Sequence, residues 1–159
     1  MSELRWLERQ LEIARKADDR QSEGHALGDL GLAYIELRDA HRAIQCFEQW
    51  LVIARETGDR SQECGAFGFL GSAYSCVGNM RRGIELYKQA ISVATEIGDL
   101  HRVAGGLFNM SLMLGASGDH IQAVTNASAA LAICEHIKSP LVERVRQQLA
   151  EWRAAGESG

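Results

Sequence analysis

The sequence repeats itself with a period of 40 residues. One turn signal recurs in the same phase three times, at Ala17–Arg20, Thr57–Arg60 and Ile97–Leu100. A second signal recurs inside each unit, as Arg38-Asp39, Gly78-Asn79 and Gly118-Asp119. Each of these pairs joins a residue suited to the end of one helix to an N-cap for the next. The period therefore predicts an array of two-helix units joined by short turns.

Both helices of a unit are amphipathic, because their apolar residues recur at steps of three and four. In the first unit the expected core positions of the two helices are Ala26, Leu27, Leu30, Ala33, Tyr34 and Leu37, then Ala43, Ile44, Phe47, Trp50, Leu51 and Ala54. No helix pair can hide both stripes alone, so neighbouring pairs must stack and share a continuous core. The expected fold class is an all-α solenoid of antiparallel helix pairs.

The spacing Leu30-Gly31-x-x-Tyr34, followed by Ala43 and Phe47, resembles the tetratricopeptide repeat. The second unit repeats this pattern as Leu70-Gly71-x-x-Tyr74, Gly83, Tyr87 and Ala90, and the third is a decayed copy. The 40-residue length is similar to the longer repeats of Pins-type G-protein-signalling modulators and of bacterial members of the family. The resemblance implies a right-handed α-solenoid whose first helices line a concave wall that binds other proteins.

The repeats predict a single domain over residues 1–159, with about eight helices. Its expected parts are a half repeat at 2–18, repeats at 20–57, 60–97 and 100–137, and a capping helix at 140–155. The capping helix is expected to begin at Ser139-Pro140 and to bury Leu141, Val142, Val145, Leu149 and Trp152. Nothing upstream supplies a partner for the half repeat, which leaves one of its sides uncovered. Either the chain is cut from a longer one, or two copies meet through this side.

Composition argues against several classes of partner. The net charge is −4, with both signs interspersed, which is unlike a nucleic-acid-binding or membrane-surface protein. The N-terminus carries charges instead of an apolar stretch, so the cytoplasm is the expected compartment. The four cysteines lack C-x-x-C spacing and are expected to be reduced core thiols, at Cys46, Cys64, Cys76 and Cys134.

No residue pattern predicts catalysis. No nucleophile is placed beside a base, and no set of metal ligands shares one helix face. Gly65-x-x-Gly68-x-x-Gly71 lies inside an expected helix, follows no strand and lacks a P-loop lysine, so it is a packing pattern. We therefore expect no enzymatic activity, no cofactor and no metal.

The partner-binding groove is expected on the face of each first helix that lies opposite its core stripe. In the three units these positions are His25, Gly28, Asp29, Leu32, Ile35 and Glu36; Gly65, Gly68, Phe69, Ser72, Ser75 and Cys76; and Gly105, Phe108, Asn109 and Leu112. A mid-helix glycine costs about 0.8–1 kcal/mol relative to alanine, so these glycines need a reason. Either they form a floor that a partner approaches closely, with Leu32, Phe69, Phe108 and Leu112 as apolar anchors, or they only let the chain's own helices pack.

Trp50 departs from the family pattern, which has a small residue there. We expect it to fill the core, with nearby glycines leaving room for the indole, and an exposed anchor is the alternative. Tetratricopeptide modules that grip a terminal carboxylate carry lysine, arginine and asparagine along the groove, whereas here only Asn109 is of that kind. The leading hypothesis is an adaptor that holds an apolar helix or extended segment of a partner protein. The alternative is a self-association module that dimerises through the half repeat.

Overall fold

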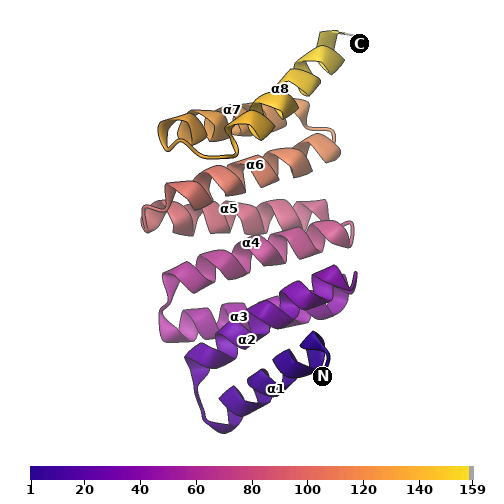
Figure 1. Ribbon diagram of the computed structural model, residues 1–159. Coiled ribbons are helices and arrows are strands. Elements are labelled where there is room, and N and C mark those ends of the chain that lie inside the picture. Colours follow the sequence, from indigo (N-terminus) through magenta and orange to yellow (C-terminus); the bar gives the residue numbers. More distant parts are fainter. Residues whose placement is uncertain (158–159) are drawn as a thin grey trace. The chain divides into compact units, whose positions relative to one another are not determined.

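The computed structural model describes residues 1–157 and contains only α-helices over this range (Figure 1). The helices are α1 (Glu3–Lys16), α2 (Arg20–Glu36), α3 (Ala40–Thr57), α4 (Arg60–Cys76), α5 (Met80–Glu96), α6 (Leu100–Ala116), α7 (His120–His136) and α8 (Val142–Glu157). The expected all-α organisation in helix pairs is confirmed, and α1 to α7 each lie within the predicted half repeat or repeat. None of the helices described is both long and apolar enough to cross a membrane.

A single kind of turn joins the first seven helices. The residue before each N-cap has a positive φ, from 54° at Asp18 to 93° at Gly118. The aspartate or asparagine that follows accepts a hydrogen bond from the backbone N–H three residues later, as Asp39 does from Arg42 and Asn79 from Arg82. The left-handed residue reverses the chain and the cap starts the next helix, so the turn signals in the sequence are sufficient to set these helix ends.

The last junction differs from the prediction. Ser139 Oγ accepts a hydrogen bond from the backbone N–H of Leu141, at 3.2 Å, and α8 begins only at Val142. The predicted start at Pro140 was therefore two residues too early. The serine caps a turn before the helix instead of the helix itself.

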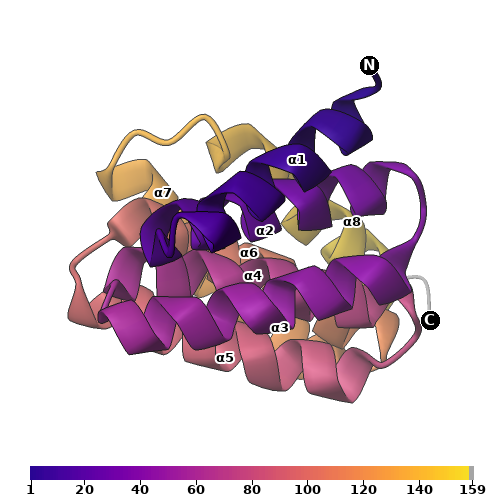
Figure 2. The same cartoon turned by 90° about the horizontal axis from the view of Figure 1, so that it is seen from below.

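The chain divides into two compact units, residues 1–86 and 87–159, with the boundary inside α5. In the first unit α2 packs against α1 and α3, and α3 packs against α4 (Figure 2). In the second unit α7 packs against both α6 and α8. Whether the whole chain folds as the single domain expected from the repeats stays a prediction.

The core of the first unit follows the predicted stripes, with Leu27, Leu30 and Phe47 among its most buried side chains. Gly31 is small because Phe47 lies directly against it: a Cβ there would lie 2.6 Å from Phe47 Cδ1. Leu37, expected in the core, is exposed, since it follows the last residue of α2 and caps that helix. In the second unit, Val145 and Leu149 of α8 are buried, which confirms the capping stripe.

A buried carboxylate ties successive repeats of the first unit together. Glu23 Oε1 lies 3.0 Å from Arg15 Nε, and Glu23 Oε2 lies 2.8 Å from an Arg20 guanidinium nitrogen. Forty residues later, Glu63 makes the same pairs with Arg55 and Arg60. The third repeat carries Thr95, Leu100 and Val103 at the corresponding positions. The decayed copy has therefore lost this ionic clamp.

Three of the four cysteines are buried thiols, as predicted, and burial raises the pKa of Cys46. Cys76 was placed in the core by the same prediction and is in fact exposed. It is the last residue of α4.

The clamp predicts a pH-dependent contribution to stability. Burial opposes ionisation of Glu23, but hydrogen bonds from Arg15 and Arg20 outweigh it and hold the pKa of this carboxyl below its usual value of 4.5. Its contribution is therefore complete above that value and is lost as the pH falls through the lowered pKa. Glu23→Gln should reduce the free energy of unfolding by about 1 kcal/mol at pH 7, with a smaller reduction at pH 3.

Urea unfolding followed by circular dichroism at both pH values measures this difference, with Glu3→Gln as the control for loss of an exposed carboxylate. An equal loss at pH 7 and pH 3 would show that the charge of Glu23 does not contribute.

Candidate functional site

The groove positions predicted for the first two repeats all lie in the first unit, on α2 and α4. All of them except Gly28 and Gly65, which pack against Trp50, form what we call the α2–α4 wall. Its residues are His25, Asp29, Leu32, Ile35, Glu36, Gly68, Phe69, Ser72, Ser75 and Cys76. Each of them is exposed or half-buried, so the wall is open to contact.

Trp50 of α3 lies behind this wall and fits against three glycines. A Cβ added at Gly28 would lie 3.4 Å from the indole, and one added at Gly65 would lie 3.1 Å from its Cη2 atom. A Cβ added at Gly24 would lie 3.5 Å from Cδ1, on the other edge of the ring. The tryptophan is buried, which confirms it as a core residue and excludes the exposed anchor. Gly28 and Gly65 therefore make room for the indole and are not a floor for a partner.

A hydrogen-bonded chain at the indole links α2 to α4. The Trp50 Nε1–H donates to Gln62 Oε1 at 2.9 Å, which satisfies the one polar atom of the buried ring. Gln62 Nε2 in turn lies 3.1 Å from His25 Nε2. The two wall helices are thus held together both by the aromatic ring and by polar contacts.

Phe69 of α4 is the exposed member of a three-ring cluster. Its ring stacks on Phe47, with centroids 5.7 Å apart, and on Trp50, with centroids 6.2 Å apart. The side chain nevertheless stays 40% exposed. Leu32 of α2 is the other large apolar side chain exposed on the wall. The wall therefore presents an apolar surface that rests on a rigid, buried support.

Gly68 differs from the glycines around Trp50. Apart from the two chain neighbours and the nearby backbone of α4 itself, no atom of the described residues lies within 4 Å of a Cβ at this position, although the residue is half-buried. Gly105, in the second unit, is open in the same way. The two explanations offered for the groove glycines therefore apply to different residues: packing explains Gly28 and Gly65, but it does not explain Gly68.

In the second unit the prediction of Phe108 as a groove anchor was wrong. Its side chain is only 2% exposed and packs in a core cluster with Ala127, Ala130, Val145 and Leu149. Residue 130 corresponds to Trp50 two repeats earlier, and it is an alanine. Because α7 offers only small side chains here, the phenylalanine of α6 fills the space instead. The alanines of α7 were the signal in the sequence that the large side chain of this helix pair lies on α6 instead of α7.

The two remaining groove positions of the second unit have different surroundings. Asn109 is exposed. Leu112 is half-buried and packs against the Phe108 cluster.

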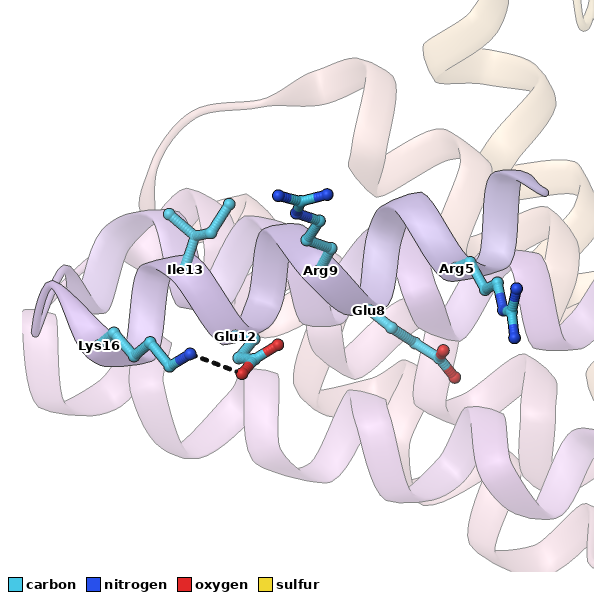
Figure 3. Close-up of a pocket in the computed structure, with 6 residues that line it drawn as sticks. All are labelled: Arg5, Glu8, Arg9, Glu12, Ile13 and Lys16. Carbon is cyan, nitrogen blue, oxygen red and sulfur yellow. Dashed lines mark ion pairs between the residues drawn. The ribbon is translucent and has the colours of Figure 1, made fainter. Parts of the chain in front are cut away.

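The outward face of α1 is the uncovered side that the half repeat predicts. Figure 3 shows the side chains along this face, those of Arg5, Glu8, Arg9, Glu12, Ile13 and Lys16, beside a shallow hollow. All of these residues belong to α1, so the hollow is an open helix face. Glu12 pairs with Lys16 along it, at 2.7 Å.

Two large apolar side chains of α1 are exposed where later repeats bury theirs. Trp6 is 52% and Ile13 50% exposed, whereas Cys46 and Ile53, the residues 40 positions later, are buried. Ile53 is covered by α2, since its Cγ2 lies 3.2 Å from the position of a Cβ on Gly24. A helix that packs as α2 does on α3 would therefore cover Ile13.

No metal centre is found among residues 1–157, where no three histidine, cysteine or acidic side chains gather to hold an ion. The strongest candidate site is the α2–α4 wall, because it presents exposed apolar side chains on a buried aromatic support.

Comparison with known proteins identifies the repeats. The family model described as Tetratricopeptide repeat matches residues 26–61 and 66–100. No curated protein matches the chain in sequence.

Similar solved structures include BtubC from P. vanneervenii, with a TM-score of 0.82 and 20% identity, over 96% of this chain and 65% of that one. A putative kinesin light chain from Podospora anserina with nearly identical TPR-like repeats has a TM-score of 0.80 and 19% identity, over 98% and 78% of the two chains. A signal-transduction ATPase from Pyrococcus horikoshii, whose tetratricopeptide repeats form a sensor, has a TM-score of 0.83 and 21% identity, over 96% and 24%.

The chain thus spans only part of each of these structures, and at these identities they show the fold alone. They place it among α-solenoids of helix pairs, as the sequence predicts, while the finer likeness to Pins-type repeats stays a prediction. Two units of the chain, at residues 26–61 and 66–100, are therefore tetratricopeptide repeats, and the fold of the chain resembles that of other proteins built from such repeats.

Proposed function

We propose that this chain is an adaptor that binds a segment of a partner protein on the α2–α4 wall. Tetratricopeptide repeats generally act as scaffolds for protein–protein interaction and not as enzymes. On this wall, Phe69 and Leu32 provide the exposed apolar contacts, and the buried rings of Phe47 and Trp50 hold Phe69 in place. In protein interfaces a few residues provide most of the binding energy, and a rigid apolar side chain supported from behind is suited to that role.

The observation that carries this proposal is the open glycine at position 68. A glycine inside a helix costs about 0.8–1 kcal/mol relative to alanine, and Gly31 offsets that cost by admitting Phe47. Gly68 has no such neighbour within the described residues. It lies next to Phe69 in the sequence, so a partner that contacts Phe69 approaches the backbone there as well. A bound apolar helix or extended segment accounts for the missing side chain.

The proposal includes a cytoplasmic location, where the free thiols of Cys46, Cys64, Cys76 and Cys134 would stay reduced. The described helices provide no membrane-spanning segment, and the mixed surface charge favours protein over nucleic acid as the partner. Peptide binding on the wall requires no cofactor.

Gly68→Leu is expected to weaken partner binding at least about tenfold while leaving the helices intact, because a side chain on the wall blocks close approach. Proteins captured from a lysate of the source organism by the wild type and by the variant, quantified by mass spectrometry, measure the effect. Gln45→Leu, which adds the same side chain to an exposed position of α3, is the matched control.

Circular dichroism of both variants verifies that they fold. Equal capture by Gly68→Leu and the wild type would contradict binding at the wall.

The exposed face of α1 supports self-association as a second candidate function. Trp6 and Ile13 occupy positions that the next repeat buries, so burying them between two copies would remove apolar surface from water. The face also carries charges of both signs, from Arg5 to Lys16, which suits contact with a similar face. In this arrangement α1 of a second copy would cover α1 of the first copy, as α2 covers α3 within one chain.

The double variant Trp6→Glu/Ile13→Glu should abolish a dimer by placing charges in its centre. Sedimentation of the wild type over a hundredfold concentration range should show a dimer that dissociates on dilution. The variant should remain a monomer at every concentration. A wild type that is monomeric throughout would exclude this second function and leave binding at the wall unaffected.

A further inference from the structure

We propose that the segment bound by the α2–α4 wall is basic, with lysine or arginine flanking the apolar residue that contacts Phe69. This inference rests on the proposed function and specifies the chemistry of the partner. It follows from the negative charge of the wall, from the absence of ion pairs to its carboxylates and from the arginines that lie over other aromatic rings of the chain.

The wall carries two carboxylates, Asp29 and Glu36, and neither lysine nor arginine. Both carboxylates belong to exposed residues of α2, on the helix that also presents Leu32. The imidazole of His25 lies against the Gln62 side chain, with the Nε2 atoms of the two residues 3.1 Å apart. The formal charge of the wall is therefore −2, from Asp29 and Glu36 alone.

These two carboxylates have no ion pair or hydrogen bond among residues 1–157, a property they share in the first unit with Glu3 and Asp18, which lie outside the wall. Elsewhere in this unit, acidic side chains commonly pair with a cation: Glu12 with Lys16, Glu23 with Arg15 and Arg20, Asp39 with Arg42, Glu56 with Arg20, and Glu63 with Arg55 and Arg60. The cation next to Glu36 in the sequence is Arg38, which lies in the turn beyond α2. The wall carboxylates are left for a cation from outside the chain.

The ring of Phe69 supplies a third feature that suits a cation. Four other rings of this chain each have an arginine over them, with the guanidinium carbon 5.1–6.0 Å from the ring centroid: Tyr34, Phe67, Tyr74 and Phe108. Phe69 has no such partner in the described part of the chain, and it is exposed beside Gly68. An incoming arginine or lysine would find there an aromatic face with carboxylates on the same wall.

The apolar contact and the charges have different roles. Exposed ion pairs contribute only a few-fold each to affinity, so burial against Phe69 and Leu32 provides most of the binding. The carboxylates select the sign of the partner, because an acidic segment on this wall would meet like charges. This arrangement is opposite in sign to a groove that grips a carboxylate with lysine and arginine.

Panning a random twelve-residue peptide library displayed on phage against residues 1–159 tests the inference. Enriched peptides should contain an apolar or aromatic residue with lysine or arginine within four positions of it. A synthetic peptide of the most enriched sequence should bind with an affinity that falls as NaCl rises from 50 to 500 mM. Asp29→Asn/Glu36→Gln should weaken it about fivefold, measured by fluorescence anisotropy.

Glu3→Gln/Asp18→Asn is the matched control, because it removes two exposed carboxylates of the same unit that lie outside the wall. It should leave the affinity unchanged. Panning against Asp29→Lys/Glu36→Lys should enrich acidic peptides instead.

Two further outcomes separate this inference from the proposed function. Peptides that lose binding with Gly68→Leu but show no excess of lysine or arginine, or that are acidic, would overturn the basic segment and leave the wall as the binding surface. Failure to enrich any peptide, or enrichment of peptides indifferent to Gly68→Leu, would overturn both proposals.

Discussion

Matching of large and small side chains between paired helices is the constraint on which this structure depends. In the first repeat Phe47 of α3 lies against Gly31 of α2, and Trp50 lies against Gly28. In the third repeat the sizes are exchanged, since Phe108 of α6 packs with Ala130 of α7. At the pair of positions 28 and 50, and at 108 and 130 two repeats later, either arrangement places one aromatic ring opposite a small residue. Interiors are packed too closely to admit a second ring at the same point, or to leave that point empty, without a cost in free energy.

This matching also shapes the candidate binding surface. Because Trp50 lies behind α2 and α4, it supports the ring of Phe69, whose side chain stays 40% exposed. The indole uses the glycines at 28 and 65, whereas the glycine at 68 remains open. The same residue that completes the core thus determines where the wall is rigid and where it can be approached. The stability of the first unit and the proposed binding at the wall would therefore both depend on this tryptophan.

The repeated elements could be predicted from the sequence because their signals are local. A left-handed residue followed by aspartate or asparagine ends one helix and caps the next, and the period places these turns correctly. The fit of Trp50 among glycines also follows from residue sizes. Phe108 was misplaced because its burial depends on alanines of another helix, which helix periodicity does not reveal. Leu37 and Cys76 were misplaced because they lie at helix ends, where an apolar stripe continues in the sequence but the packing partner does not.

A double-mutant cycle between Gly28 and Trp50 tests the size matching most directly, because it recreates in the first repeat the arrangement found in the third. Trp50→Ala should reduce the free energy of unfolding by about 3–5 kcal/mol, and Gly28→Phe by about 1–3 kcal/mol. In Gly28→Phe/Trp50→Ala the new ring enters the space that the indole leaves, so the loss should be smaller than the sum of the two by at least about 1 kcal/mol. Losses that simply add, measured by urea unfolding, would contradict the account.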